Sequence, residues 1–152
     1  MLNTTLLRIS LWLGVVGFLA SLVAHVMALS GRGSEAVMYP LHLGIFAAFA
    51  PAVFGLVGLA RQRGIDSKDG RAQRDFQLAF FKALPLWQKV AVVVVMAYAM
   101  VNFLSAFGDS MEPGAPTVRL FSGHWLLFYI LSAVLASALL READALESPR
   151  EV

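Results

Sequence analysis

The chain has 152 residues, of which 59% are hydrophobic and 14% are charged, whereas soluble domains average about 45–50% and about 25%. It contains no cysteine, which excludes disulfides, thiolate metal ligands, iron–sulfur clusters and cysteine-based catalysis. The formal net charge of +2 gives no reason to expect nucleic acid as a partner. The composition is that of an integral membrane protein.

Four stretches of the chain contain no Asp, Glu, Lys or Arg: 9–31, 36–60, 90–108 and 120–140. Each is close to or longer than the roughly 20 apolar residues that cross a hydrocarbon core about 30 Å thick as a helix. We therefore predict an all-α integral membrane protein, a single domain over residues 1–152, with four transmembrane helices in an antiparallel bundle. The spans are placed at about 9–29, 40–60, 85–107 and 119–140.

The first predicted span begins after Arg8 and ends before the helix-breaking Gly31 and Gly33. An alternative for this segment is a cleaved signal peptide, but its apolar run is longer than the roughly 7–15 residues of a signal-peptide core. The second span opens at Pro40, whose missing N–H would have no partner in the first turn of a helix. Both segments are therefore interpreted as membrane-spanning helices.

The connection between the second and third spans, residues 61–84, is predicted to contain an interfacial amphipathic helix. Apolar side chains recur here at helical spacing, with charged residues on the other side: Phe76, Ala79, Phe80, Ala83, Leu84 and Trp87. Pro85 is expected to end this helix and to start the third span. The helix either only connects the two spans or also docks a partner. A charged tail, 141–152, follows the fourth span.

Lysine and arginine are distributed unevenly between the two sides implied by four crossings. Arg32 and Arg119 lie on one side, and the other ten lie on the side of the termini and of the 61–84 connection. The positive-inside rule then predicts that both termini face the cytoplasm. We expect a multi-pass protein of a bacterial inner membrane, whose partners are the lipid bilayer and, beyond it, other membrane subunits or further copies of the chain.

Small residues within the spans predict where the helices pack, because helices in lipid associate through close van der Waals contact. The first span carries Gly14, Gly17, Ser21 and Ala28 on one side. The second carries Ala47, Pro51 and Gly55, with Gly44, Ala48 and Gly58 close by, and the fourth carries Ser132, Ala136 and Ser137.

The polar side chains within the spans gather at the end of the bundle opposite the termini. They are His25, His42 and His124, and a stripe at helical spacing on the third span formed by Tyr98, Asn102, Ser105 and Asp109. Polar and ionisable groups inside a span are costly and usually face a bundle interior or a cavity, so these are the candidate functional residues. Because the other half of the spans offers only Ser137, a channel or a transporter is disfavoured.

Two functions fit this arrangement. The first is a small structural or accessory membrane protein without a cofactor or catalytic activity, in which the histidines are interfacial anchors or bond to neighbours. The second is a membrane redox subunit with a site near the outer face. There His25 and His124 would bind haem b or a transition metal, with His42 as a further metal ligand, and Asn102 and Tyr98 would help to hold the cofactor or a quinone.

The directions of the two main candidate ligands are not predicted equally well. His25 shares a helix face with Ser21 and other small residues, which points it inward, whereas His124 shares a face with Phe128 and would face lipid equally well. Ser122 and His124 are two residues apart and point roughly 200° from one another on a helix, so they are not expected to act as a nucleophile and base.

Overall fold

The computed structural model describes residues 2–66, 68–106 and 114–147. In these ranges the chain is helical and contains no strand, which confirms the predicted all-α class. Four helices are long and apolar enough to cross a membrane, and a shorter amphipathic helix lies between the second and third of them. The helices are α1 (Thr4–Leu29), α2 (Met38–Gln62), α3 (Gly70–Ala83), α4 (Leu86–Ala106) and α5 (Ala115–Glu147), and a 3₁₀ turn, η1 (Glu35–Val37), precedes α2.

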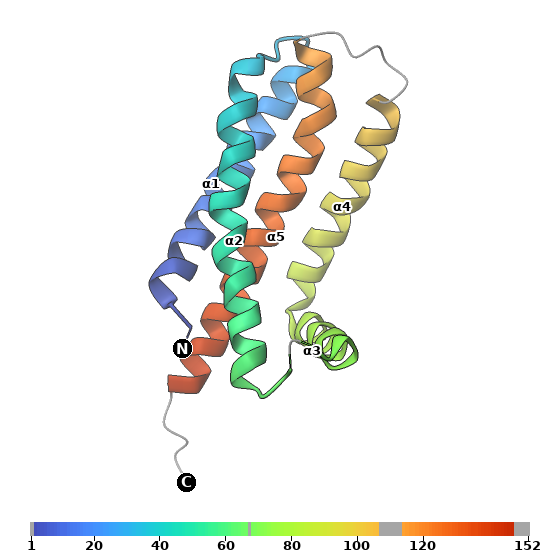
Figure 1. Ribbon diagram of the computed structural model, residues 1–152. Coiled ribbons are helices and arrows are strands. Elements are labelled where there is room, and N and C mark those ends of the chain that lie inside the picture. Colours follow the sequence, from blue (N-terminus) through green and yellow to red (C-terminus); the bar gives the residue numbers. More distant parts are fainter. Residues whose placement is uncertain (1, 67, 107–113, 148–152) are drawn as a thin grey trace.

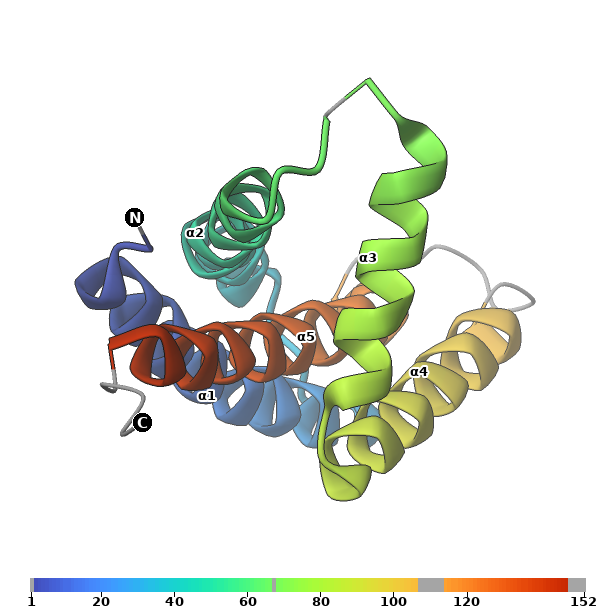
Figure 2. The same cartoon turned by 90° about the horizontal axis from the view of Figure 1, so that it is seen from below.

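The longest helix, α5, lies at the centre of the bundle (Figure 1). It packs against α1, α2 and α4, while α1 also packs against α2. In its apolar stretch 56% of the residues are buried, against 17–22% in those of the other three long helices. α3 lies crosswise at one end of the bundle (Figure 2). We call this end, where α1 begins and α2 and α5 end, the terminal end, and the opposite end the distal end.

Glycine ends α1 and α2 in the same way. Gly31 and Gly64 follow the two helices with φ angles of 75° and 74°, a left-handed conformation that glycine adopts without steric cost. The N–H of Arg32 donates to the Met27 carbonyl at 2.9 Å, and the corresponding bond after α2 is 3.1 Å long. This is the Schellman motif, which pairs carbonyls that the last helical turn leaves free.

The small residues of α1 form its contact face with α5, as predicted. Gly14 and Gly17 are both buried. A Cβ atom on Gly14 would lie 2.8 Å from the backbone nitrogen of Ala133, and one on Gly17 would lie 2.1 Å from the ring of Tyr129. The two backbones approach so closely because these positions carry no side chain.

The predicted small-residue face of α2 is confirmed in part. Gly55 lies against Leu7 and Leu139, and Ala48 and Ala52 are fully buried, but Ala47 is exposed. The hydroxyls of Ser10 and Ser132 donate to the Ala48 carbonyl at 2.5 and 2.7 Å, and these bonds fix the rotation of α2. Because small residues lie around much of α2, its sequence alone does not select the face that packs.

The aromatic face of α3 packs against the terminal end of the bundle. Phe76 and Phe80 are buried in the same cluster as Leu59 of α2. Trp87, predicted on this face, is instead 67% exposed. The chain leaves helical geometry before Pro85, so Trp87 belongs to α4 and no longer follows the phase of α3.

Candidate functional site

His25 of α1 is buried near the distal end and links three helices. Its Nδ1 lies 2.5 Å from the Ser122 hydroxyl of α5, and its Nε2 bonds to the Tyr98 hydroxyl of α4. Ser122 also donates to the carbonyl of Arg119 at 2.9 Å. Because a serine hydroxyl has one proton, Ser122 accepts from the Nδ1–H of His25, and the Tyr98 O–H then donates to Nε2. The imidazole is therefore held in one neutral tautomer.

Asn102 of α4 joins this cluster through the backbone of α5. Its Nδ2 donates to the Arg119 carbonyl at 2.8 Å, so that this oxygen accepts from both Asn102 and Ser122. Gly123 allows the approach, because a Cβ atom there would lie only 3.1 Å from the Asn102 amide nitrogen. We call His25, Tyr98, Asn102, Ser122 and the Arg119 carbonyl the His25 cluster.

The predicted polar stripe on α4 faces the bundle. Tyr98, Asn102 and Ser105 each hydrogen-bond to a residue of α1 or α5. Asp109, the last member of the stripe, lies outside the described residues. The single-helix pattern thus indicates the inward face correctly, although it does not name the partners on the other helices.

The structure does not bring His25 and His124 together as a facing pair. His124 follows Ser122, the partner of His25, by two residues and therefore leaves α5 about 200° around the helix. Its ring lies edge-on to Phe103 of α4, with the centroids 5.3 Å apart. Both ring nitrogens of His25 are hydrogen-bonded, so neither is free for haem iron or another metal in this arrangement. The buried Nδ1 of His124 has no hydrogen-bond partner among the described residues.

His42, the further predicted metal ligand, lies near the start of α2. Its Nδ1–H donates to the Met38 carbonyl at 2.9 Å, and its Nε2 accepts from the indole N–H of Trp125 at 3.4 Å. The rings of Phe121 and Trp125 lie edge-on to it, with centroids 5.4 and 5.3 Å away. In the part of the chain that the structure describes, no three His, Cys, Asp or Glu side chains form a group that could hold a metal ion.

A lateral pocket of about 510 Å³ lies between α2 and α5 and is lined by both His42 and His124. We call it the lateral pocket. Six aromatic side chains form much of the rest of its wall: Phe46, Phe49, Phe54, Phe121, Trp125 and Phe128. Two of the three histidines of the predicted metal site therefore line one cavity, although they come from different helices.

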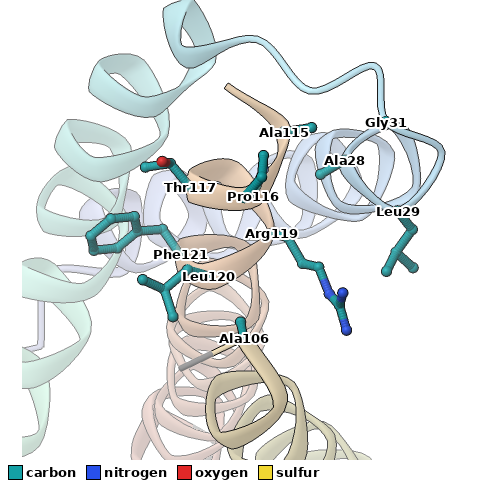
Figure 3. Close-up of a pocket in the computed structure, with 10 residues that line it drawn as sticks. All are labelled: Ala28, Leu29, Gly31, Ala106, Ala115, Pro116, Thr117, Arg119, Leu120 and Phe121. Carbon is teal, nitrogen blue, oxygen red and sulfur yellow. The ribbon is translucent and has the colours of Figure 1, made fainter. Parts of the chain in front are cut away.

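A second cavity, of about 370 Å³, opens at the distal end (Figure 3). It lies where α1 and α4 end and α5 begins, and Arg119 is the charged residue in its lining. The Arg119 side chain reaches between α1 and α4, where its guanidinium donates to the Ser105 hydroxyl at 3.3 Å. Phe121 borders this cavity as well as the lateral pocket, so the two are neighbours along α5.

A polar cluster at the terminal end was not predicted from the sequence. Gln88, in the first turn of α4, is 1% exposed; its amide nitrogen donates to the Ser137 hydroxyl at 2.8 Å and its oxygen accepts from Arg141 at 3.1 Å. A glutamine beside Lys89 at the start of a span is expected to face headgroups. Only the position of α5 shows that Gln88 is bonded on both sides.

No family model, curated protein or solved structure matches this chain. Its function must therefore be inferred from its own geometry. That geometry offers two kinds of feature. The first is the hydrogen-bonded clusters that join helices, and the second is a lateral aromatic pocket lined by His124, whose buried Nδ1 has no partner in the described part of the chain.

Proposed function

We propose that this chain is a multi-pass membrane protein with a structural or accessory role and no catalytic chemistry of its own. The observation that carries the proposal is the state of its buried polar side chains. Of the seven buried polar residues in the described ranges, all but Ser21 are hydrogen-bonded to another helix. These bonds hold the helices to one another, which is the role that a structural protein requires of its buried polar groups.

The bonds lie at three levels of the bundle. The His25 cluster joins α1, α4 and α5 near the distal end, the serines at the Ala48 carbonyl join α1, α2 and α5 midway, and Gln88 joins α4 to α5 at the terminal end. Lipid tails are as apolar as leucine, so helices in a bilayer gain little from hydrophobic contact alone. Interhelical hydrogen bonds at several depths therefore suit a stable scaffold in lipid.

The outer surface supports membrane insertion and contact with other subunits. Large apolar side chains point outward on three of the long helices; Trp12 on α1, Phe54 on α2 and Val101 on α4 are 67%, 73% and 65% exposed. Apolar surface this extensive is usually covered by lipid or by a partner. The bilayer, other membrane subunits and further copies of the chain are the partners that fit it.

The charge distribution supports an orientation. Of the eleven lysines and arginines in the described ranges, nine lie at the terminal end, on α3 or in the adjoining segments, and Arg32 and Arg119 lie at the distal end. The positive-inside rule then favours a cytoplasmic terminal end, which fits the inner membrane of a bacterium. The His25 cluster and the lateral pocket would lie in the outer half of the bilayer.

The alternative is a redox subunit that binds haem, a metal or a quinone. The absorption spectrum and metal content of the full chain purified in detergent separate the accessory role from a redox subunit that holds a haem or a metal. We expect neither a Soret band nor stoichiometric metal, and His25→Ala should lower the melting temperature without changing the spectrum. A Soret band that disappears in His25→Ala and in His124→Ala would overturn the proposal and establish the redox subunit.

A further inference from the structure

The lateral pocket has the form of a ligand site that is entered from lipid. Its volume of about 510 Å³ lies within the roughly 300–1,000 Å³ typical of small-molecule sites. Its wall belongs to α2 and α5 alone, and Phe46 and Phe54, which form part of that wall, are 70% and 73% exposed. The pocket therefore opens sideways, through the apolar surface that the proposed function assigns to the membrane.

The wall is aromatic and partly rigid. Trp125 is fully buried at the back of the pocket, and its indole N–H is fixed by the bond to His42. Phe49 and Phe128 lie edge-on to each other, with their centroids 5.8 Å apart. Aromatic rings in such a wall favour a flat ring in the ligand, because edge-to-face and offset contacts between rings add to simple apolar burial.

The polar capacity of the pocket is concentrated on one residue. His42 uses Nδ1 for the Met38 carbonyl and Nε2 for Trp125. His124 makes a ring contact with Phe103, but its Nδ1 is buried and has no hydrogen-bond partner in the described ranges. A buried ring nitrogen without a partner is unfavourable, and a turn of the imidazole toward the pocket would let an oxygen atom on a ligand bond to it.

We propose that the lateral pocket binds a lipid-soluble molecule with a flat ring and a carbonyl or hydroxyl oxygen on that ring, the chemistry of an isoprenoid quinone. The ring lies among the aromatic side chains with its oxygen at His124, and the apolar tail leaves toward Phe54. A phospholipid acyl chain would use neither the rings nor the imidazole. A haem held between two histidines would need a free nitrogen on His42, which has none.

Trp125 provides the readout, because quinones quench indole fluorescence at short range. In a chain that carries Trp12→Phe and Trp87→Phe, Trp125 is the remaining tryptophan of the three. Both replaced residues are 67% exposed and lie outside the pocket wall. The full chain in detergent is titrated with decyl-ubiquinone. 1-Decanol, which has a similar tail but no ring, is then added as a competitor.

Two variants test the pocket directly, and a matched variant controls for the substitution itself. Ala50→Phe fills the pocket, whereas Ala47→Phe places the same side chain on the exposed outer face of α2. His124→Phe keeps a ring but removes its hydrogen bonding. We expect saturable quenching that Ala50→Phe abolishes and Ala47→Phe preserves, and about 10-fold weaker binding in His124→Phe.

Quenching that does not saturate would refute the site, as would equal binding by the Ala50→Phe and Ala47→Phe variants. If 1-decanol at an equal concentration displaces decyl-ubiquinone, the pocket is a groove for acyl chains instead. Circular dichroism of each variant shows whether it is folded. If Ala50→Phe does not fold, the binding measured for His124→Phe decides whether the site exists. These outcomes are independent of the Soret band, so failure of this site and failure of the accessory role are distinguishable.

Discussion

Replacing Gly17 by alanine should destabilise the bundle, because the new methyl group would overlap the ring of Tyr129. A Cβ atom at this position would lie 2.1–2.5 Å from three atoms of the ring. The ring cannot easily move away, since its hydroxyl donates to the Leu41 carbonyl at 2.7 Å and lies against Gly44, where a Cβ would be 2.2 Å from the oxygen. Relief of the overlap therefore requires both a separation of α1 from α5 and loss of the Tyr129 bond.

The expected magnitude follows from these two costs. Overpacking by one methyl group in a close contact costs about 1–3 kcal/mol, and loss of a hydrogen bond adds about 1 kcal/mol. The free energy of unfolding should thus fall by about 2–4 kcal/mol, which lowers the melting temperature by roughly 4–15 °C in a chain of this size. Gly58→Ala is the control, because nothing lies within 4 Å of the added atom; it should be neutral or slightly stabilising.

The assay is thermal unfolding in detergent, followed by circular dichroism at a fixed heating rate. A double-mutant cycle with Tyr129→Ala tests the cause, since Gly17→Ala should cost little once the ring is absent. Gly55→Ala should fall between Gly17→Ala and the control, because its neighbours are the flexible ends of Leu7 and Leu139 at 3.0 Å. Equal shifts for Gly17→Ala and Gly58→Ala, or full additivity in the cycle, would show that the contact is described wrongly.

Two further predictions concern the orientation and the mid-bundle bonds. In intact cells, an impermeant maleimide should label Ser34→Cys but not Lys68→Cys; the reverse pattern would invert the orientation. Ser10→Ala and Ser132→Ala should each lower the free energy of unfolding by about 0.5–1.5 kcal/mol; their effects should not simply add, because both hydroxyls bond to the Ala48 carbonyl. Unchanged melting temperatures in both serine variants would argue against these bonds.

The sequence predicted part of the candidate site because one helix face carries enough information by itself. His25 shares a face with Ser21 and other small residues, and this pattern correctly indicated an inward direction. It did not indicate Ser122 as the partner, since that depends on how α1 and α5 are aligned along their axes. For His124 the face carries Phe128 and Leu131, which would suit lipid as well as a neighbouring helix, so its position at the edge of a pocket became clear only from the neighbouring helices.

The sequence itself determined the number and approximate positions of the long helices, the end of α1 at Gly31 and the contact face of α1. Each depends on interactions within a few turns of one helix. The tertiary structure decided the central place of α5, the choice of Ala48 over Ala47, the separation of His25 from His124 and the pairing of Gln88 with Ser137. These features depend on the rotation and axial alignment of one helix against another. Because α2 and α5 carry suitable small or polar residues on more than one face, only the combined contacts of all the helices select among the possible packings.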